Sequence, residues 1–135
     1  EEQYLEYSLK YIKKILKKLS EDPVTSKTPT IVFARDPKCN LNEFKLDGLS
    51  CYGMFTSVDP ISAIRIFEGS HALQGNLDPK ILLEEDSVIK ESAIKMLSEF
   101  KDFPGYIFNL GHGITPDINP DKVKVLVEAI RESGS

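Results

Sequence analysis

The sequence predicts an α/β protein built on a parallel β-sheet. Short apolar segments alternate with longer segments that have helical periodicity. The apolar segments alternate little between polar and apolar residues, which is typical of strands covered on both faces. The order is a helix followed by four strand–helix units. A doubly wound sheet fits this order, and so does half of a (β/α)₈ barrel, because a complete barrel needs about 250 residues and the chain has 135.

The first predicted helix precedes a polar linker at residues 23–28. Its apolar residues recur at three- and four-residue steps and therefore share one face: Tyr4, Leu5, Leu9, Ile12, Ile15, Leu16 and Leu19. A run of lysines lies toward its C-terminal end, which suits the helix dipole: Lys10, Lys13, Lys14, Lys17 and Lys18. This run favours a solvated face over a phosphate or membrane patch.

The remaining elements follow from apolar runs and capping residues. Strands are predicted at residues 30–33, 51–55, 71–74 and 106–109, with Gly53 weakening the second. A helical stretch at residues 41–46 is expected to end at Gly48. Asp59 and Asn119 are the expected N-caps of helices that start at Pro60 and Pro120. A longer helix is predicted at residues 86–100, with its apolar residues mostly inward: Val88, Ile89, Ile94, Met96 and Leu97.

Composition excludes several function classes. A net charge of −4 disfavours general affinity for nucleic acid, and no stretch approaches the roughly 20 apolar residues of a membrane span. Cys39 and Cys51 are expected to be reduced thiols, and no metal-ligand spacing, Walker loop or dinucleotide motif is found. We therefore expect no cofactor and no metal. No export signal is visible. The lack of an initiator Met suggests a fragment, in which any targeting segment would be invisible.

Reactive groups of parallel α/β proteins cluster beyond the C-terminal ends of the strands. Here that rule selects the loops at residues 34–40, 56–59, 75–79 and 110–116. Gly75 allows a sharp turn in the third loop. His112 stands between Gly111 and Gly113, where it could hold a carboxylate or pass a proton, or could simply be bonded for structure. His71 begins a strand at the opposite end and is expected to be structural.

Two of these loops resemble a known family. Residues 73–79 read LQGNLDP and residues 109–114 read NLGHGI, as in uroporphyrinogen decarboxylases. The P-D-x-x-P pattern at residues 116–120, the LKYI run at residues 9–12 and the IVFARD run at residues 31–36 are similar to family segments in the same order. The resemblance implies that residues 1–135 are the C-terminal half of a (β/α)₈ TIM barrel, a single unit of a longer domain whose N-terminal half is absent.

The resemblance also implies a function. The family is a carboxy-lyase of heme and tetrapyrrole biosynthesis that converts uroporphyrinogen III to coproporphyrinogen III and CO₂ without metal or organic cofactor. His112 matches the family histidine, so it is expected to bind a substrate carboxylate or to assist proton transfer. The other functional residues of the family lie in the N-terminal half, and the isolated fragment is therefore expected to be inactive. The implied partners are uroporphyrinogen, the missing half-barrel and a second subunit in a homodimer. The resemblance also implies a cytoplasmic protein, or a plastid protein if a targeting segment was removed.

One segment departs from the family pattern. Where the family reads G-L-D-W-T, residues 53–57 read GMFTS, so Phe55 and Thr56 replace an aspartate and a tryptophan. We expect altered loop packing in a divergent lineage, although a degenerate copy would also fit. Two other functions remain open: a non-catalytic tetrapyrrole-binding fragment, and a related zinc-dependent corrinoid or coenzyme M methyltransferase, which the separation of Cys39 from His112 disfavours.

Overall fold

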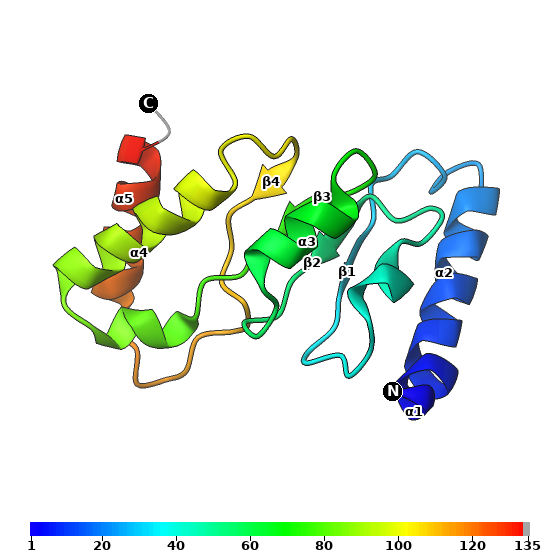
Figure 1. Ribbon diagram of the computed structural model, residues 1–135, viewed down its shortest axis with the longest axis horizontal. Coiled ribbons are helices and arrows are strands. Elements are labelled where there is room, and N and C mark those ends of the chain that lie inside the picture. The colour runs from blue at the N-terminus through cyan, green and yellow to red at the C-terminus, as the bar shows by residue number, and fades with distance from the viewer. Residues whose placement is uncertain (134–135) are drawn as a thin grey trace.

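The fold is a parallel sheet with its elements laid out in chain order (Figure 1). The structure, a computed structural model, describes residues 1–133. The four strands are β1 (Ile31–Phe33), β2 (Cys51–Gly53), β3 (Ala72–Gln74) and β4 (Tyr106–Ile107). Each strand pairs in parallel with the next, aligning Ile31 with Cys51, Cys51 with Ala72 and Leu73 with Tyr106. The predicted α/β class with four parallel strands is confirmed.

The strand order distinguishes the two architectures that the sequence left open. The order is β1-β2-β3-β4, so each strand lies beside its neighbour in sequence. A doubly wound sheet reverses its strand order at a switch point, whereas successive units of a (β/α)₈ barrel follow one another in one direction. Within residues 1–133 there is no such reversal. The sheet is therefore the half-barrel of the prediction.

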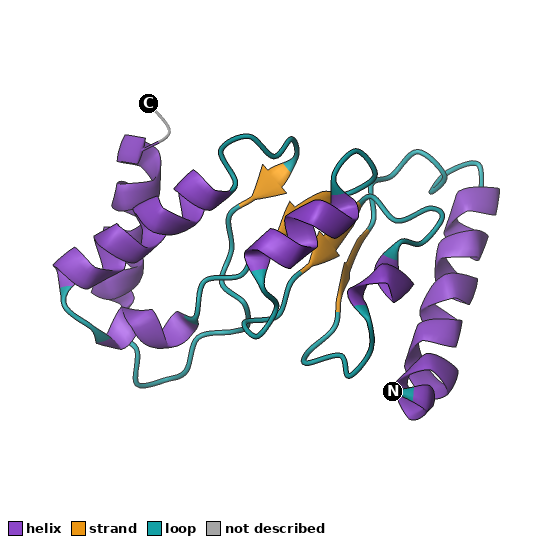
Figure 2. Cartoon of the chain, in the orientation of Figure 1, coloured by secondary structure: helices purple, strands orange, loops and turns teal. Residues whose placement is uncertain are grey.

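Helices connect the strands, as Figure 2 shows. The N-terminal helix is continuous over α1 (Glu2–Tyr4), a π-helical turn η1 (Leu5–Leu9) and α2 (Lys10–Glu21). The other helices are α3 (Pro60–Phe67), α4 (Asp86–Glu99) and α5 (Pro120–Ser133), and there are two 3₁₀ helices, η2 (Leu41–Phe44) and η3 (Pro79–Leu83). α4 and α5 pack side by side at the end of the molecule opposite α2 (Figure 1).

Capping follows the chemistry expected from the sequence. The carboxylate of Asp59 accepts a hydrogen bond from the backbone N–H of Ser62 at 2.8 Å, which satisfies one unpaired donor of α3. The side chain of Asn119 accepts from the N–H of Asp121 at 3.0 Å at the start of α5. Both predicted N-caps are confirmed.

The core has two parts. The larger part joins α2, the sheet and α3, and at its centre Tyr52 lies between Phe44 and Phe67, with ring centroids 4.6 and 5.2 Å away. Because burial disfavours the phenolate, the pKa of Tyr52 is raised well above its ordinary value. The smaller part joins η3, α4 and α5 around Leu82, Ile89 and Leu126. Met96 of α4 packs against both parts and links them.

Several predicted boundaries were wrong. The ladder between β3 and β4 ends at Gly75 and resumes with a single bridge between Leu77 and Leu110, so the fourth strand is shorter than predicted. The helical stretch before β2 ends at Phe44, and Gly48 instead occupies a separate turn with a φ of +80°. The 3₁₀ helix η3 was not predicted, because Asp78 and Pro79 favoured only a bend.

Some residues predicted to face inward are exposed. Ile15 and Ile94 are 57% and 51% exposed, and Val88 is also exposed, because no described element covers these positions. Amphipathic spacing places a residue on a face of its helix but does not show whether another element covers that face. Ile15 and Ile31 both line a groove between α2 and β1.

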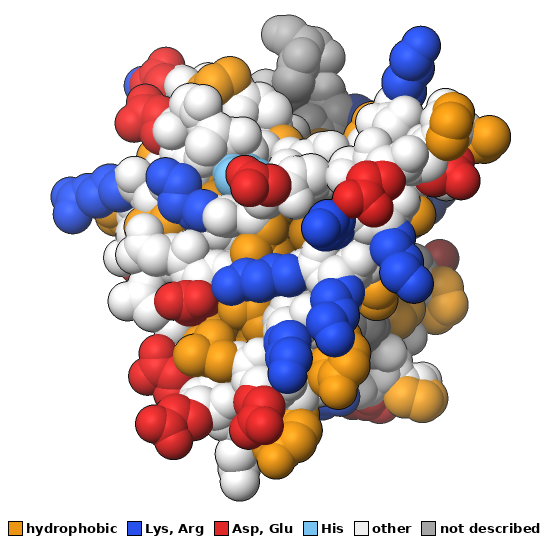
Figure 3. Space-filling model, turned by 90° about the vertical axis from the view of Figure 1, so that its right-hand side faces the viewer, with side chains coloured by type: hydrophobic (Ala, Val, Ile, Leu, Met, Phe, Trp, Pro, Cys, Tyr) orange, Lys and Arg blue, Asp and Glu red, His pale blue; other side chains and the backbone are white. Residues whose placement is uncertain are grey.

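The lysine run of α2 forms a solvated face, as predicted. All five lysines are exposed, and Figure 3 shows basic and acidic side chains interspersed on the side of the molecule that α2 forms. Lys13 and Lys17 lie 3.8 Å from the carboxylates of Glu43 and Glu21. Among residues 1–133, no helix combines the length and the apolar character that crossing a membrane requires.

Candidate functional site

The loops that follow the four strands meet at one edge of the sheet, because all four strands run in the same direction. Backbone hydrogen bonds join two of these loops beyond the regular ladder. The N–H of Leu77 donates to the carbonyl of Asn109 at 3.1 Å, and the N–H of Gly111 donates to the carbonyl of Leu77 at 2.8 Å. The Gly75 turn and the Gly111–Gly113 turn therefore share one rim, as the sequence predicted.

Two glycines allow the loops to approach this closely. A Cβ on Gly111 would lie 2.6 Å from the backbone nitrogen of Thr56, a distance that real side chains do not reach. Gly75 has a φ of +119°, and a Cβ there would lie 2.8 Å from the carbonyl oxygen of Met54. At both positions the space of a side chain is filled by the backbone that follows β2. The glycines of the two loop motifs therefore bring three loops into direct contact.

His112 lies on this rim between Gly113 and Phe55. Its Nδ1 is 2.9 Å from the carbonyl oxygen of Gly113, its own neighbour. Because a carbonyl only accepts, Nδ1 carries the proton of this hydrogen bond. Nε2 is then left to accept from, or when protonated to donate to, a bound group. The imidazole also lies against the ring of Phe55, with centroids 5.7 Å apart and planes inclined by 31°.

A shallow cavity of about 360 Å³ opens beside the imidazole. Its lining comes from three of the four strand ends: Phe33, Gln74, Asn109, Leu110, His112, Gly113 and Ile114. No carboxylate belongs to this lining within the described chain. The polar side chains of the lining are two amides and an imidazole, which can hydrogen-bond to a bound polar group.

Tyr106 holds the Gly75 turn that forms part of the rim. Its hydroxyl donates a hydrogen bond to the carbonyl of Gly75. Its ring stacks on Phe100, with centroids 3.9 Å apart and planes 3° from parallel. Burial raises the pKa of the Tyr106 phenol well above its ordinary value, so it remains a donor at neutral pH. This hydrogen bond fixes the Gly75 turn against β4.

The loop predicted at residues 110–116 supplies four of the seven lining residues, His112 among them, but the prediction did not select the strand-end residues Phe33 and Gln74. Phe33 and Gln74 are the last residues of β1 and β3, and a strand-end rule applied to single residues would have found them. Phe55 was noted only as a departure from a family pattern. Its contact with His112 depends on how two distant loops pack, and the sequence carries no signal for that.

His71 lies immediately before β3, at the end of the sheet away from His112. Its Nε2 is 3.2 Å from the carbonyl oxygen of Leu46, and its ring meets Phe67 edge-on, with centroids 5.7 Å apart. These contacts are those of a histidine that holds a loop. The structure thus separates the two histidines and places only His112 on the rim.

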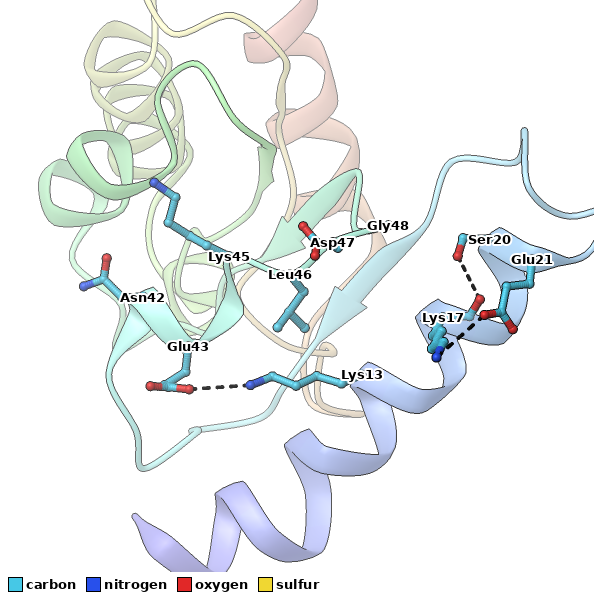
Figure 4. A pocket seen from close by; sticks show the side chains of 10 residues that line it. All are labelled: Lys13, Lys17, Ser20, Glu21, Asn42, Glu43, Lys45, Leu46, Asp47 and Gly48. Carbon is cyan, nitrogen blue, oxygen red and sulfur yellow. Dashed lines mark hydrogen bonds and ion pairs between the residues drawn. The ribbon is translucent and has the colours of Figure 1, made fainter.

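A larger cleft, of about 740 Å³, lies between α2 and the segment that leads into β2 (Figure 4). Its lining combines three lysines and three acids: Lys13, Lys17, Lys45, Glu21, Glu43 and Asp47. The opposite charges are equal in number, and two of the lysines are already ion-paired. Asp47 and Gly48 precede β2, so this cleft is not part of the rim that carries His112.

Neither cysteine lines the cavity beside His112. Cys51 is buried in β2 and Cys39 is half-buried, and neither forms a disulfide. Burial raises the pKa of both thiols, and for Cys39 the carboxylates of Glu1 and Glu43 raise it further. Within residues 1–133, no group of three or more His, Cys, Asp or Glu side chains is arranged to hold a metal ion.

Comparison with known proteins identifies the family. The model of the uroporphyrinogen decarboxylase family matches residues 1–133. The chain belongs to this family. It is 37% identical over 131 residues to the uroporphyrinogen decarboxylase of Alcanivorax borkumensis, covering 97% of this chain and 37% of the relative. It is 38% identical over 140 residues to that of Chloroherpeton thalassium, covering 99% of this chain and 38% of the relative.

The chain thus spans little more than a third of the length of these decarboxylases. Among solved structures, a methyltransferase from Methanosarcina mazei matches with a TM-score of 0.69 and 18% identity, over 95% of this chain and 38% of that one. At this identity the likeness concerns the fold alone. It agrees with the decarboxylase match, in that the chain again corresponds to only part of a longer protein.

The structure also locates the residues that depart from the decarboxylase pattern. Phe55 contacts the ring of His112, and Thr56 contacts the backbone of Gly111. Phe55 also lies near Phe33, with ring centroids 6.5 Å apart. The two replacements therefore lie against the His112 turn, and the turn itself keeps the geometry that its glycines require.

Proposed function

We propose that this chain acts as the C-terminal part of a uroporphyrinogen decarboxylase, which removes the acetate carboxyls of uroporphyrinogen III to give coproporphyrinogen III and CO₂. The observation that carries the proposal is the convergence of the Gly75 and Gly111–Gly113 turns on one rim, with His112 beside a cavity without carboxylates. Family membership supports the same reaction.

His112 is the group of this chain that we propose to meet the substrate. Because Nδ1 bonds to the carbonyl of Gly113, Nε2 is the atom left to act. As a cation the imidazole would pair with a substrate carboxylate, and as a neutral base it would accept a proton. The amides of Gln74 and Asn109 line the same cavity and can bond further carboxylates.

The proposal includes a partner, the N-terminal half of the same barrel, since residues 1–135 then form one incomplete unit of a longer domain. Within the described chain, β1 and β4 each have one unpaired edge. Ile31 and Phe33 of β1 are each 50% exposed. Unpaired strand edges next to exposed apolar residues favour the addition of further strands. A homodimer of complete barrels in the cytoplasm is the further expectation.

The test uses a completed barrel, in which the N-terminal part of the Alcanivorax borkumensis relative that precedes the aligned segment is joined to this chain. It is incubated with uroporphyrinogen under reducing, anaerobic conditions, and the products are separated by chromatography after oxidation to porphyrins. We expect coproporphyrinogen from the completed barrel and none from the isolated chain.

A completed barrel that unfolds cooperatively but forms no coproporphyrinogen would contradict the proposal. If the joined chain does not fold, the two parts are coexpressed as separate chains, and failure of the parts to copurify also counts against it. Substrate binding without turnover would instead indicate a non-catalytic tetrapyrrole-binding role.

A further inference from the structure

Asn76 is the one buried polar residue among the described, well-buried positions, with 4% of its surface exposed. Its side-chain amide donates two hydrogen bonds, to the carbonyl of Phe55 at 3.0 Å and to the carbonyl of Val58 at 2.7 Å. Both donors of the amide are used, and both bonds cross from the loop after β3 to the loop after β2. The carbonyl of Phe55 also accepts from the backbone N–H of Val58 at 2.9 Å. The amide thus adds a bond to that carbonyl and bonds the carbonyl of Val58, and the two bonds together tie the second loop to the loop after β3.

Leu77, the next residue, holds the loop that follows β4. The backbone of Leu77 donates to the carbonyl of Asn109 and accepts from the N–H of Gly111. Two consecutive residues therefore contact both flanking loops, Asn76 through its side chain and Leu77 through its backbone. Together they set the spacing between the loop after β2 and the turn that carries His112.

The loop that Asn76 holds is the one that contacts the His112 turn. Phe55, whose carbonyl accepts from Asn76, lies with its ring against the imidazole of His112. Thr56, the next residue, fills the space beside Gly111. A shift of this loop would therefore uncover the imidazole and loosen the turn at the same time.

We propose that Asn76 is a positioning residue for His112, acting through the Phe55 ring that its side chain holds in place; the consequence for turnover rests on the function proposed above. Asn76 does not belong to the lining of the cavity beside His112, so its effect on catalysis is indirect. Misplacement of a catalytic group by about 1 Å can lower the rate on the order of 10²-fold. Loss of the two hydrogen bonds of Asn76 can therefore lower the rate although Asn76 lies outside the cavity.

The first test is a double-mutant cycle in the completed barrel. Asn76→Leu removes both donors at similar volume, and it is combined with His112→Asn. We expect Asn76→Leu to lower kcat/KM by roughly tenfold when His112 is present, with little further effect once His112 is replaced. Equal losses in both backgrounds would overturn the proposal, because Asn76 would then act on the fold alone. Asn42→Leu, an exposed asparagine at η2, is the matched control.

The second test does not depend on turnover. Diethylpyrocarbonate modifies accessible imidazoles, and peptide mass mapping reports the rates for His112 and His71 separately. We expect Asn76→Leu to raise the ratio of the His112 rate to the His71 rate several-fold, because the Phe55 ring no longer covers His112. An unchanged ratio would overturn the proposal even in an active enzyme.

Phe55→Leu provides the same readout if Asn76→Leu does not fold, since it keeps both hydrogen bonds of Asn76 but shortens the covering side chain. The ratio should rise in this variant as well, and no rise would refute the role of the ring. A completed barrel without decarboxylase activity would contradict the proposed function, and the modification ratio would still decide the role of Asn76.

Discussion

The backbone of Thr56 occupies the space that a side chain of Gly111 would fill, with its nitrogen 2.6 Å and its Cα 2.7 Å from the position of a Cβ. The two residues come from loops after different strands, β2 and β4. This contact shows that the loops after β2 and β4 pack directly against each other. Any side chain at position 111 would clash with the backbone of Thr56. Rotation of side chains cannot relieve this clash, so the backbone must move.

We expect Gly111→Ala to lower the free energy of unfolding of the completed barrel by roughly 1–3 kcal/mol, the usual cost of overpacking. Urea denaturation measures the change. Gly113→Ala is the control for stability, because a Cβ on Gly113 meets no heavy atom within 4 Å. It should change stability by less than about 0.5 kcal/mol. Equal effects of the two substitutions would show that the loops are not in tight contact.

Tyr106→Phe should destabilise the completed barrel by about 1 kcal/mol at neutral pH, because the carbonyl of Gly75 loses its donor. The ring remains and still stacks on Phe100, so the change isolates the hydrogen bond. Tyr7→Phe, at an exposed tyrosine of the first helix, serves as the control. No difference between the two variants in urea denaturation would mean that the hydroxyl contributes nothing.

Alkaline pH should weaken the wild type more than the Tyr106→Phe variant. Burial raises the pKa of Tyr106 above its ordinary value of 10.0, so the unfolded chain releases this proton first. The stabilisation is fully present below about pH 10 and is lost as the pH rises toward the pKa of the folded state. Unfolding free energies between pH 9 and 11 test this, and parallel curves for the two proteins would exclude it.

The chain alone should associate in dilute solution, because the edge of β1 is unpaired and Ile31 and Phe33 beside it are exposed. Sedimentation velocity should show species larger than a monomer. Ile31→Lys should reduce this association, since a charged side chain at a strand edge opposes pairing. Val24→Lys in the exposed linker is the control. A monodisperse, cooperatively folded monomer would contradict the open-edge interpretation.

Replacement of His112 by Asn should lower kcat/KM of the completed barrel by roughly 10²-fold, which is typical of a lost proton-transfer group. His71→Asn is a matched control, because that histidine bonds to Leu46 and lies away from the rim. It should retain turnover at temperatures where the protein stays folded. Unchanged kinetics in the His112 variant would remove this residue from the mechanism.

The elements that followed from the sequence are those with a local physical cause. Asp59 and Asn119 cap helices through bonds to residues two or three positions away, and the sequence contains both partners. The convergence of Gly75 and Gly111 followed from one rule, that parallel strands end at a common edge. The glycines at the strand ends predicted that the backbone there is closely approached. They did not predict which other backbone segment makes the approach.

The rest depended on contacts between loops. The two hydrogen bonds of Asn76 join residues from separate strand–helix units, so no spacing in the sequence predicts them. Phe55 and His112 likewise come from loops after different strands, and their ring contact has no local cause in the sequence. Ile15 and Ile94 fit the apolar face of a helix by pattern, yet they are exposed because no described element covers them. Burial depends on neighbouring elements, which a helical period does not reveal.

The spatial order of the strands also bears on how the chain folds. Ile31 aligns with Cys51, Cys51 with Ala72, and Leu73 with Tyr106, so each pairing closes only one connecting segment. Closing one such segment costs less entropy than pairing strands from distant parts of the sequence. Strands can add one at a time at either edge of the sheet. In a complete barrel, the slow step should be the closure that pairs the first and last strands, which are far apart in the sequence.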